Sequence, residues 1–357
     1  MDLENLWGSI KEPMFNYLKE KFDAGELDLS DIGNAAKTYS RKAFKVISRS
    51  MYDAILHDKD SGLKEHRKIM DDFLARLSND WGEGFDLLEI FIAISREIAS
   101  DWIKDRNFVR NELTMSLMRL QARGCQVASE ILVLLRNGFA DGAFARWRTL
   151  HEIAVVCLFL NKYGIEAARR YIASDVVESY KIAIKEISCR QEMGYDGPSD
   201  DEFETLKRNV AEVKIKFGDE IFEQYGWASP YIVKKRVLFS DIEKDVDLDR
   251  FRRNYGVASS NVHAGVKGIS FKISLLGDID VILAGPSNTG FAEPGHSAAI
   301  SLLQINSTLL LMQDPAQAVI YIHILSLMSN DIGEKLLQSH AEVLKKYKEI
   351  GRTIVES

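Results

Sequence analysis

Apolar residues recur at helical spacing along most of the chain, and this pattern predicts an all-α fold. Residues 32–55 place their apolar side chains on one helical face, and a second helix is expected to begin at Gly62. The run 79–84 contains two glycines and predicts a turn. The next run, 85–102, is strongly apolar and predicts a buried helix. Together these elements indicate an N-terminal helical region over residues 1–108.

Two long helices are expected to follow as an antiparallel hairpin. The first spans residues 110–137 and ends before Gly138, a residue type that favours the position just after a helix. Asp141 is a natural N-cap for the second helix, which is expected to run to about residue 163, before Gly164. A link this short between two helices places them side by side.

The rest of the chain predicts further helices and one strand pair. Ser199 is expected to cap a charged helix that reaches about Phe217. Strand-like segments flank Gly277 and Asp278, so a short β-hairpin is expected near residues 271–284. We therefore predict an all-α multi-helix bundle with this single hairpin, whose core domain covers residues 109–357.

The expected core of that domain is the apolar helical pattern over residues 126–161. We predict that it is buried between a helix over residues 247–263 and the apolar C-terminal helices.

Charge and cysteine content indicate which partners and which cellular compartment the protein is expected to have. A net charge of −7 argues against broad, nonspecific binding to a nucleic-acid backbone, because such binding needs a dominant positive field. Cys125, Cys157 and Cys189 are odd in number and widely spaced, which is typical of reduced thiols. The first residues lack the features of a signal peptide, and no apolar run is long enough to span a membrane. We expect a cytoplasmic protein without a membrane partner.

Four polar residues interrupt the apolar pattern within one short stretch: Arg146, Arg148, His151 and Glu152. Arg148 and Glu152 are four residues apart and therefore share a helical face. A charge on a buried helix must be paired, since a broken buried pair costs roughly 3–5 kcal/mol. The cluster is therefore either a buried structural network or a functional site, and the residues alone leave both readings open.

A second reading concerns Arg146 and His151, whose Arg-x4-His spacing occurs in the all-helical ribonucleases of the HEPN class (higher eukaryotes and prokaryotes nucleotide-binding). In such a site the arginine stabilises charge on the phosphate and the histidine transfers a proton.

A second polar group follows about a hundred residues later. Ser259 and His263 are spaced to share one helical face, and His263 is expected to reach across the bundle to the Arg148–Glu152 pair. A Ser–His nucleophile pair is the alternative. His296, at the start of an apolar helix, is a further candidate for the same cleft.

Neither a zinc-ligand spacing nor a phosphate-binding glycine loop occurs in the sequence. We therefore expect no metal and no nucleotide cofactor.

The elements Ala143-x4-Arg148-x3-Glu152 and Tyr255-x3-Ser259-x3-His263-x-Gly265 resemble those of the bacterial family called domain of unknown function 5677 (DUF5677). The resemblance covers about residues 110–315 and implies an all-helical fold. It implies that Arg148, Glu152, Ser259 and His263 correspond to the recurring polar residues of the family, and it does not favour Arg146 and His151. Some members of the family lie beside antiphage or toxin genes.

Two functions remain open from the sequence. The first is a metal-independent, RNA-cleaving effector of stress or antiphage defence, in which Arg148 holds a phosphate or orders Glu152 and His263 is the acid–base, with Ser259 beside it. The alternative is a noncatalytic module that binds a partner protein or a small ligand, with the same residues as a structural clamp. RNA or a small ligand would enter an internal cleft, and a homo-oligomer is compatible with either function.

Overall fold

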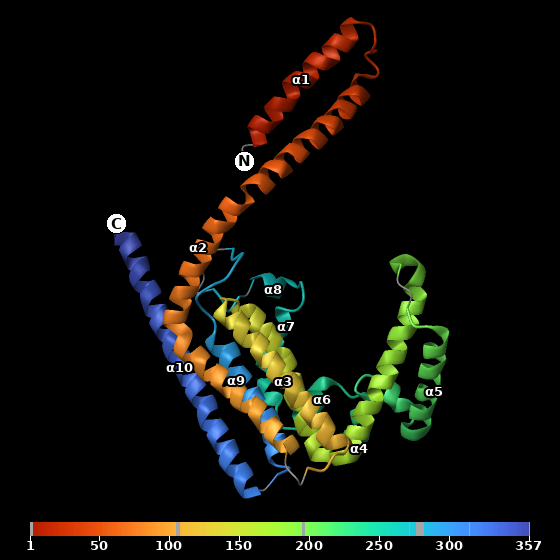
Figure 1. The fold of residues 1–357 in the computed structure, drawn as a ribbon, viewed down its shortest axis with the longest axis vertical. Coiled ribbons are helices and arrows are strands. Elements are labelled where there is room, and N and C mark those ends of the chain that lie inside the picture. Colours follow the sequence, from red (N-terminus) through yellow and green to blue (C-terminus); the bar gives the residue numbers. More distant parts are fainter. Residues whose placement is uncertain are drawn as a thin grey trace. The chain divides into compact units, whose positions relative to one another are not determined.

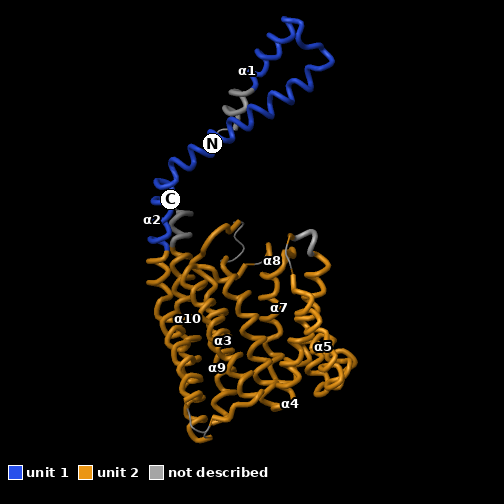
Figure 2. Tube along the Cα trace, turned by 45° about the vertical axis from the view of Figure 1, so that its right-hand side comes forward, with its two compact units in different colours: residues 1–73 blue, residues 74–357 orange. Residues whose placement is uncertain are grey.

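A computed structural model describes residues 3–104, 108–194, 197–270, 272–275, 282–313 and 315–356, and all regular elements within these ranges are helices (Figure 1). This confirms the predicted all-α class. The chain divides into two compact units, residues 1–73 and residues 74–357, which Figure 2 shows in separate colours. The boundary lies well before the expected one at residue 108.

Unit 1 is a pair of helices, α1 (Leu3–Asp23) and the first part of α2 (Ile32–Lys104). The rings of Tyr17 and Tyr39 lie 4.9 Å apart and join the two helices. The Ser40 hydroxyl adds a contact of 3.2 Å to the sulfur of Met14.

Helix α2 is continuous, so the predicted helix start at Gly62 and the predicted turn at 79–84 are both wrong. Packing explains why the helix persists through its glycines. Trp81 is fully buried and meets the ring of Phe291 edge-on at 4.9 Å. A Cβ atom on Gly84 would lie 2.6 Å from Cδ2 of Leu336, so this glycine permits a close approach of two helices rather than a turn.

The core of unit 2 is formed by the second part of α2, α3 (Glu112–Arg136), α4 (Ala140–Met193), α9 (Ala292–Leu310) and α10 (Pro315–Glu356), as Figure 1 shows. The predicted hairpin of α3 and α4 is confirmed, and Gly138 joins them with a φ of 85°. The largest fully buried side chains are Trp81, Trp147, Phe85, Phe91, Phe144, Phe159, Phe291, Leu77, Leu88, Leu117 and Ile131.

Helix α4 is longer than the pattern predicts, but its backbone breaks where the sequence indicates. Gly164 has φ 76° and ψ −155°, which lie outside the helical region. The chain then continues as a second helical segment to Met193. Helix α5 (Asp200–Phe217) begins at Ser199, whose hydroxyl accepts a hydrogen bond from the backbone N–H of Glu202, so the predicted cap is confirmed.

Six short elements follow α5 in the described part of the chain. They are the 3-10 helices η1 (Asp219–Phe222), η2 (Gly226–Tyr231) and η3 (Asp249–Phe251), and the α-helices α6 (Phe239–Asp245), α7 (Arg252–Ser260) and α8 (Val266–Ser270). Four of them (η1, η2, α6 and α7) contact α4. Both α7 and α9 contact α4, which confirms the predicted burial of this helix.

The predicted β-hairpin is not seen: residues 272–275 and 282–284 contain no strand, and the intended turn at Gly277 and Asp278 lies outside the described residues. The reason lies at the start of α4. The carboxylate of Asp141 accepts hydrogen bonds from the backbone N–H of Ile273, at 3.1 Å, and from the hydroxyl of Ser274. Asp141 therefore anchors this loop instead of capping its own helix, whose N-cap is Phe139.

Candidate functional site

One turn of α4 carries the predicted ion pair at the edge of the core. Trp147, Leu150 and His151 are buried, whereas the side chains of Arg148 and Glu152 keep 31% and 30% of their exposure. Nη2 of Arg148 lies 3.1 Å from Oε1 of Glu152. Both groups are thus paired and still reach solvent.

Helix α7 completes this cluster with two residues one turn apart. The hydroxyl of Tyr255 donates a hydrogen bond of 2.5 Å to Oε1 of Glu152. Nε of Arg148 donates to the hydroxyl of Ser259 at 3.2 Å, and that hydroxyl donates to the backbone carbonyl of Tyr255 at 2.8 Å. We call Arg148, Glu152, Tyr255 and Ser259 the clamp, because they tie α4 to α7.

Tyr255 is the best enclosed member of the clamp, with 8% of its surface exposed. Burial, followed by its hydrogen bond to Glu152, raises the pKa of Tyr255 far above its usual range. The phenol therefore stays protonated at neutral pH and acts as a hydrogen-bond donor to the carboxylate.

A second polar pair lies next to the clamp, where the ring centroids of His151 and Tyr255 are 5.9 Å apart. Nε2 of His151 and Oε1 of Glu243 are 2.8 Å apart, and neither side chain is exposed. The other carboxylate oxygen of Glu243 accepts from Nη1 of Arg252 at 2.9 Å. Nδ1 of His151 is buried without a hydrogen-bond partner among the described residues.

The two groups share the ring of Tyr255. The guanidinium carbon of Arg148 lies 4.7 Å from the ring centroid, and that of Arg252 lies 5.1 Å from it. Cation–π contacts of this length are worth about 0.5–1 kcal/mol at exposed sites. Sequence reasoning missed Glu243 and Arg252, because neither has a spacing that relates it to α4.

His263 is not brought to the clamp. Helix α7 ends at Ser260, and His263 lies beyond it in a bend with an exposed side chain. No hydrogen bond, ion pair or ring contact joins it to Arg148 or Glu152 in the described part of the chain. Tyr255 occupies the place beside the carboxylate that was expected for the histidine.

Arg146 and His151 contact side chains of two different helices. Nε of Arg146 donates to Glu130 of α3, and its Nη1 lies 3.1 Å from the hydroxyl of Thr149. His151 instead faces Glu243 of α6 and is fully buried. The two residues of the HEPN-like spacing therefore do not face a common cleft.

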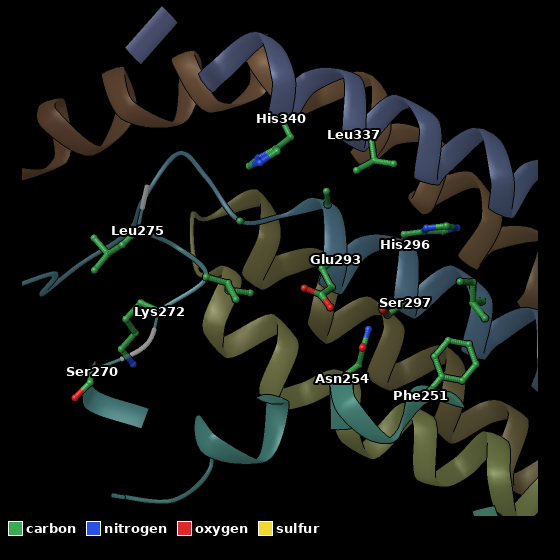
Figure 3. A pocket seen from close by; sticks show the side chains of 14 residues that line it. Phe251, Asn254, Ser270, Lys272, Leu275, Glu293, His296, Ser297, Leu337 and His340 are labelled. Atoms are coloured by element: carbon green, nitrogen blue, oxygen red, sulfur yellow. The ribbon is translucent and has the colours of Figure 1, made fainter. Parts of the chain in front are cut away.

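A separate pocket of about 880 Å³ opens between α7, α9, α10 and the loop 272–275 (Figure 3). This volume lies in the range of small-molecule sites, roughly 300–1,000 Å³. Its lining is mixed: Phe251, Asn254, Ser270, Lys272, Ile273, Leu275, Gly290, Ala292, Glu293, His296, Ser297, Ile300, Leu337 and His340. Helix α7 thus carries the pocket residue Asn254 as well as the clamp residues Tyr255 and Ser259.

The predicted candidate His296 lines this pocket and not the clamp. Burial lowers the pKa of its imidazole, which favours the neutral form at pH 7. A Cβ atom on Gly333 would lie 2.6 Å from Cε1 of His296, so the backbone of α10 closes tightly over this ring.

The described residues also bear on metal binding, thiol reactivity and membrane spanning. They contain no group of three or more His, Cys, Asp and Glu side chains that could hold a metal ion. Burial raises the pKa of the Cys125 thiol to about 11 and that of Cys157 further still, so these thiols stay protonated. Cys189 is half-buried. Within the part of the chain that is described, no helix is long and apolar enough to cross a membrane.

Comparison with known proteins finds one family model that overlaps the clamp. Residues 115–279 match the model of a family described as a family of unknown function, DUF5677, which confirms the resemblance predicted from the sequence. The match is narrower than the expected range of 110–315 but includes every clamp residue. No curated protein and no solved structure matches the chain.

Proposed function

We propose that this chain, whose residues 115–279 form a DUF5677 segment, is a noncatalytic module that binds a small ligand in the pocket beside α7. In this proposal the clamp is structural and fixes α7 against α4. One observation carries the proposal: α7 directs Tyr255 and Ser259 to the clamp, while its residue Asn254 lines the pocket.

The charges of the clamp favour a structural role. Within the clamp Arg148 is paired with Glu152, and next to the clamp Arg252 is paired with Glu243, so each of these cations already has an anionic partner. The raised pKa of Tyr255 keeps its phenol protonated, so this residue does not act as a general base at neutral pH. Proton transfer by a histidine would need an accessible imidazole, and His151 is sealed in the core.

Metal-independent RNA cleavage is the second candidate, with a role in stress or antiphage defence. The exposure of Arg148 and Glu152, 31% and 30%, supports it, because a phosphate could approach both groups. Arg148 would contact the phosphate and Glu152 would accept a proton. This candidate requires His263 to approach from its exposed position, or another group to donate the proton.

We place the protein in the cytoplasm in both proposals. Its free cysteines, Cys125, Cys157 and Cys189, are the expected state in a reducing compartment.

A double-mutant cycle tests the clamp. Tyr255→Phe, Glu152→Gln and the double variant are unfolded in urea, and we expect a coupling of about 0.5–3 kcal/mol, as for directly interacting groups. The same proteins are incubated with total RNA, and none should cleave it. RNA cleavage that Glu152→Gln abolishes at unchanged stability would contradict the binding proposal and favour the ribonuclease. Glu223→Gln, at an exposed position outside the clamp, serves as the matched control in the RNA assay.

A further inference from the structure

We propose that the pocket beside α7 takes a small zwitterionic molecule with an apolar middle. Its ammonium group would contact Glu293 and its anionic group Lys272. This inference rests on the proposed ligand-binding function and adds the chemical class of the ligand.

The two charges of the pocket are available to a ligand. Glu293 lies in the first turn of α9, and Lys272 lies on the loop that Asp141 anchors. Figure 3 shows Lys272 on the loop side of the pocket and Glu293 on the α9 side. Within the described ranges, no hydrogen bond or ion pair involves either side chain. A lysine and a glutamate that are unpaired on the walls of one pocket favour a molecule carrying both opposite charges.

The wall that carries Lys272 is fixed before any ligand binds. Asp141 holds the backbone N–H of Ile273, and the hydroxyl of Ser287 donates to the carbonyl of Ser274 at 2.7 Å. Gly290, with φ 88°, lies so close that a Cβ atom would be 2.4 Å from the carbonyl oxygen of Ile273. A preorganised wall of this kind reduces the ordering that binding must supply.

The other residues that line the pocket would form uncharged polar contacts with the ligand and pack against its apolar middle. Burial lowers the pKa of His296, so this ring favours the neutral form beside the ligand. His340 also lines the pocket, and its Nδ1 is buried without a hydrogen-bond partner among the described residues. Ile300 and Leu337 supply apolar surface.

The test uses ω-amino carboxylates of increasing length, from 4-aminobutyrate to 8-aminooctanoate, with hexanoate, hexylamine and hexanamide as singly charged and neutral probes. Calorimetry on the full chain should show binding of at least one zwitterion, about tenfold or more tighter than either singly charged probe. The graded series is needed because the ligand must span both charges.

Two variants locate the binding. Lys272→Met and Glu293→Gln should each weaken zwitterion binding about tenfold. The matched controls Lys235→Met and Glu223→Gln change exposed residues outside the pocket and should leave it unchanged. Circular dichroism and the urea midpoint of each variant show whether it is folded. An unfolded Glu293→Gln is replaced by Glu293→Asp, which keeps the charge, shortens its reach and should shift the preferred probe to a longer one.

Three results would overturn the inference. One is that no zwitterion binds, and another is that Lys272→Met and Glu293→Gln bind the zwitterion as the wild type does. The third is that hexanoate, hexylamine or hexanamide binds as tightly as any zwitterion, in which case the ligand-binding function stands and only its class is wrong. Failure of the function itself appears separately, as RNA cleavage that depends on Glu152.

Discussion

The hydroxyl of Tyr255 donates a hydrogen bond of 2.5 Å to Glu152 across 103 residues of sequence. This contact joins α7, a helix of nine residues, to the long core helix α4. Because Glu152 is also bound by Arg148, the carboxylate receives donors from both helices. Oε1 of Glu152 thus helps to fix α7 against α4, together with the hydrogen bond from Arg148 to Ser259.

Removing the Tyr255 hydroxyl should loosen this junction. Tyr255→Phe keeps the ring between the two guanidiniums but removes the donor to Glu152, so we expect a loss of about 1–2 kcal/mol in the free energy of unfolding. Urea denaturation followed by fluorescence measures it. Tyr347→Phe, at an exposed position on α10, is the control and should change stability by less than about 0.5 kcal/mol. Equal effects of the two substitutions would disprove the role of the hydroxyl.

The two residues with HEPN-like spacing should differ sharply in their effect on stability. His151→Ala opens a cavity and leaves buried Glu243 without one of its two partners, so we expect a loss of about 3–5 kcal/mol. Arg146→Ala removes a partly exposed ion pair to Glu130 and should cost about 0.2–1 kcal/mol. Thermal unfolding of both variants checks the order, and a reversed order would mean that His151 is not sealed in the core.

A methyl group at position 290 should disturb the loop that carries Lys272. Gly290 has φ 88°, and a Cβ atom there would meet the carbonyl oxygen of Ile273 at 2.4 Å. We expect Gly290→Ala to destabilise the protein by about 1–3 kcal/mol. Gly285→Ala, where nothing lies within 4 Å, is the control. A Gly290→Ala protein as stable as the Gly285→Ala protein would show that the loop does not pack against Gly290.

His296 should make stability depend on pH in the acidic range. Burial lowers its pKa below the ordinary value of 6.5, so the unfolded chain binds a proton more readily than the folded protein does. Stability is therefore lost as pH falls through about 6.5 and below. His296→Gln should reduce this loss between about pH 7 and pH 5, whereas His57→Gln, at an exposed position, should retain it. Identical slopes for wild type and His296→Gln would contradict the burial of the neutral ring.

Helical spacing was sufficient to predict the local parts of the site. Arg148 and Glu152 pair as their separation of four residues requires, and Ser259 reaches the same cluster. The predicted position of His263 was wrong because it depended on where α7 ends. Because α7 ends at Ser260, the shared face expected for Ser259 and His263 does not extend to the histidine.

The unpredicted parts depend on contacts between distant segments. Glu243 is a single carboxylate in a short helix, and its partner His151 lies 92 residues earlier in the chain. Asp141 has the sequence signature of an N-cap, yet its carboxylate binds a loop more than 130 residues away. Such pairings leave no periodic signal, since each involves only one residue from each segment.

The shared ring of Tyr255 has a consequence for which substitutions homologues of this chain can accept. Arg148 and Arg252 contact the same ring, and each also holds its own carboxylate, so a substitution at any one of these positions strains the others. Homologues should therefore exchange these residues in concert, and a lineage that loses the tyrosine should also lose at least one of the two arginines.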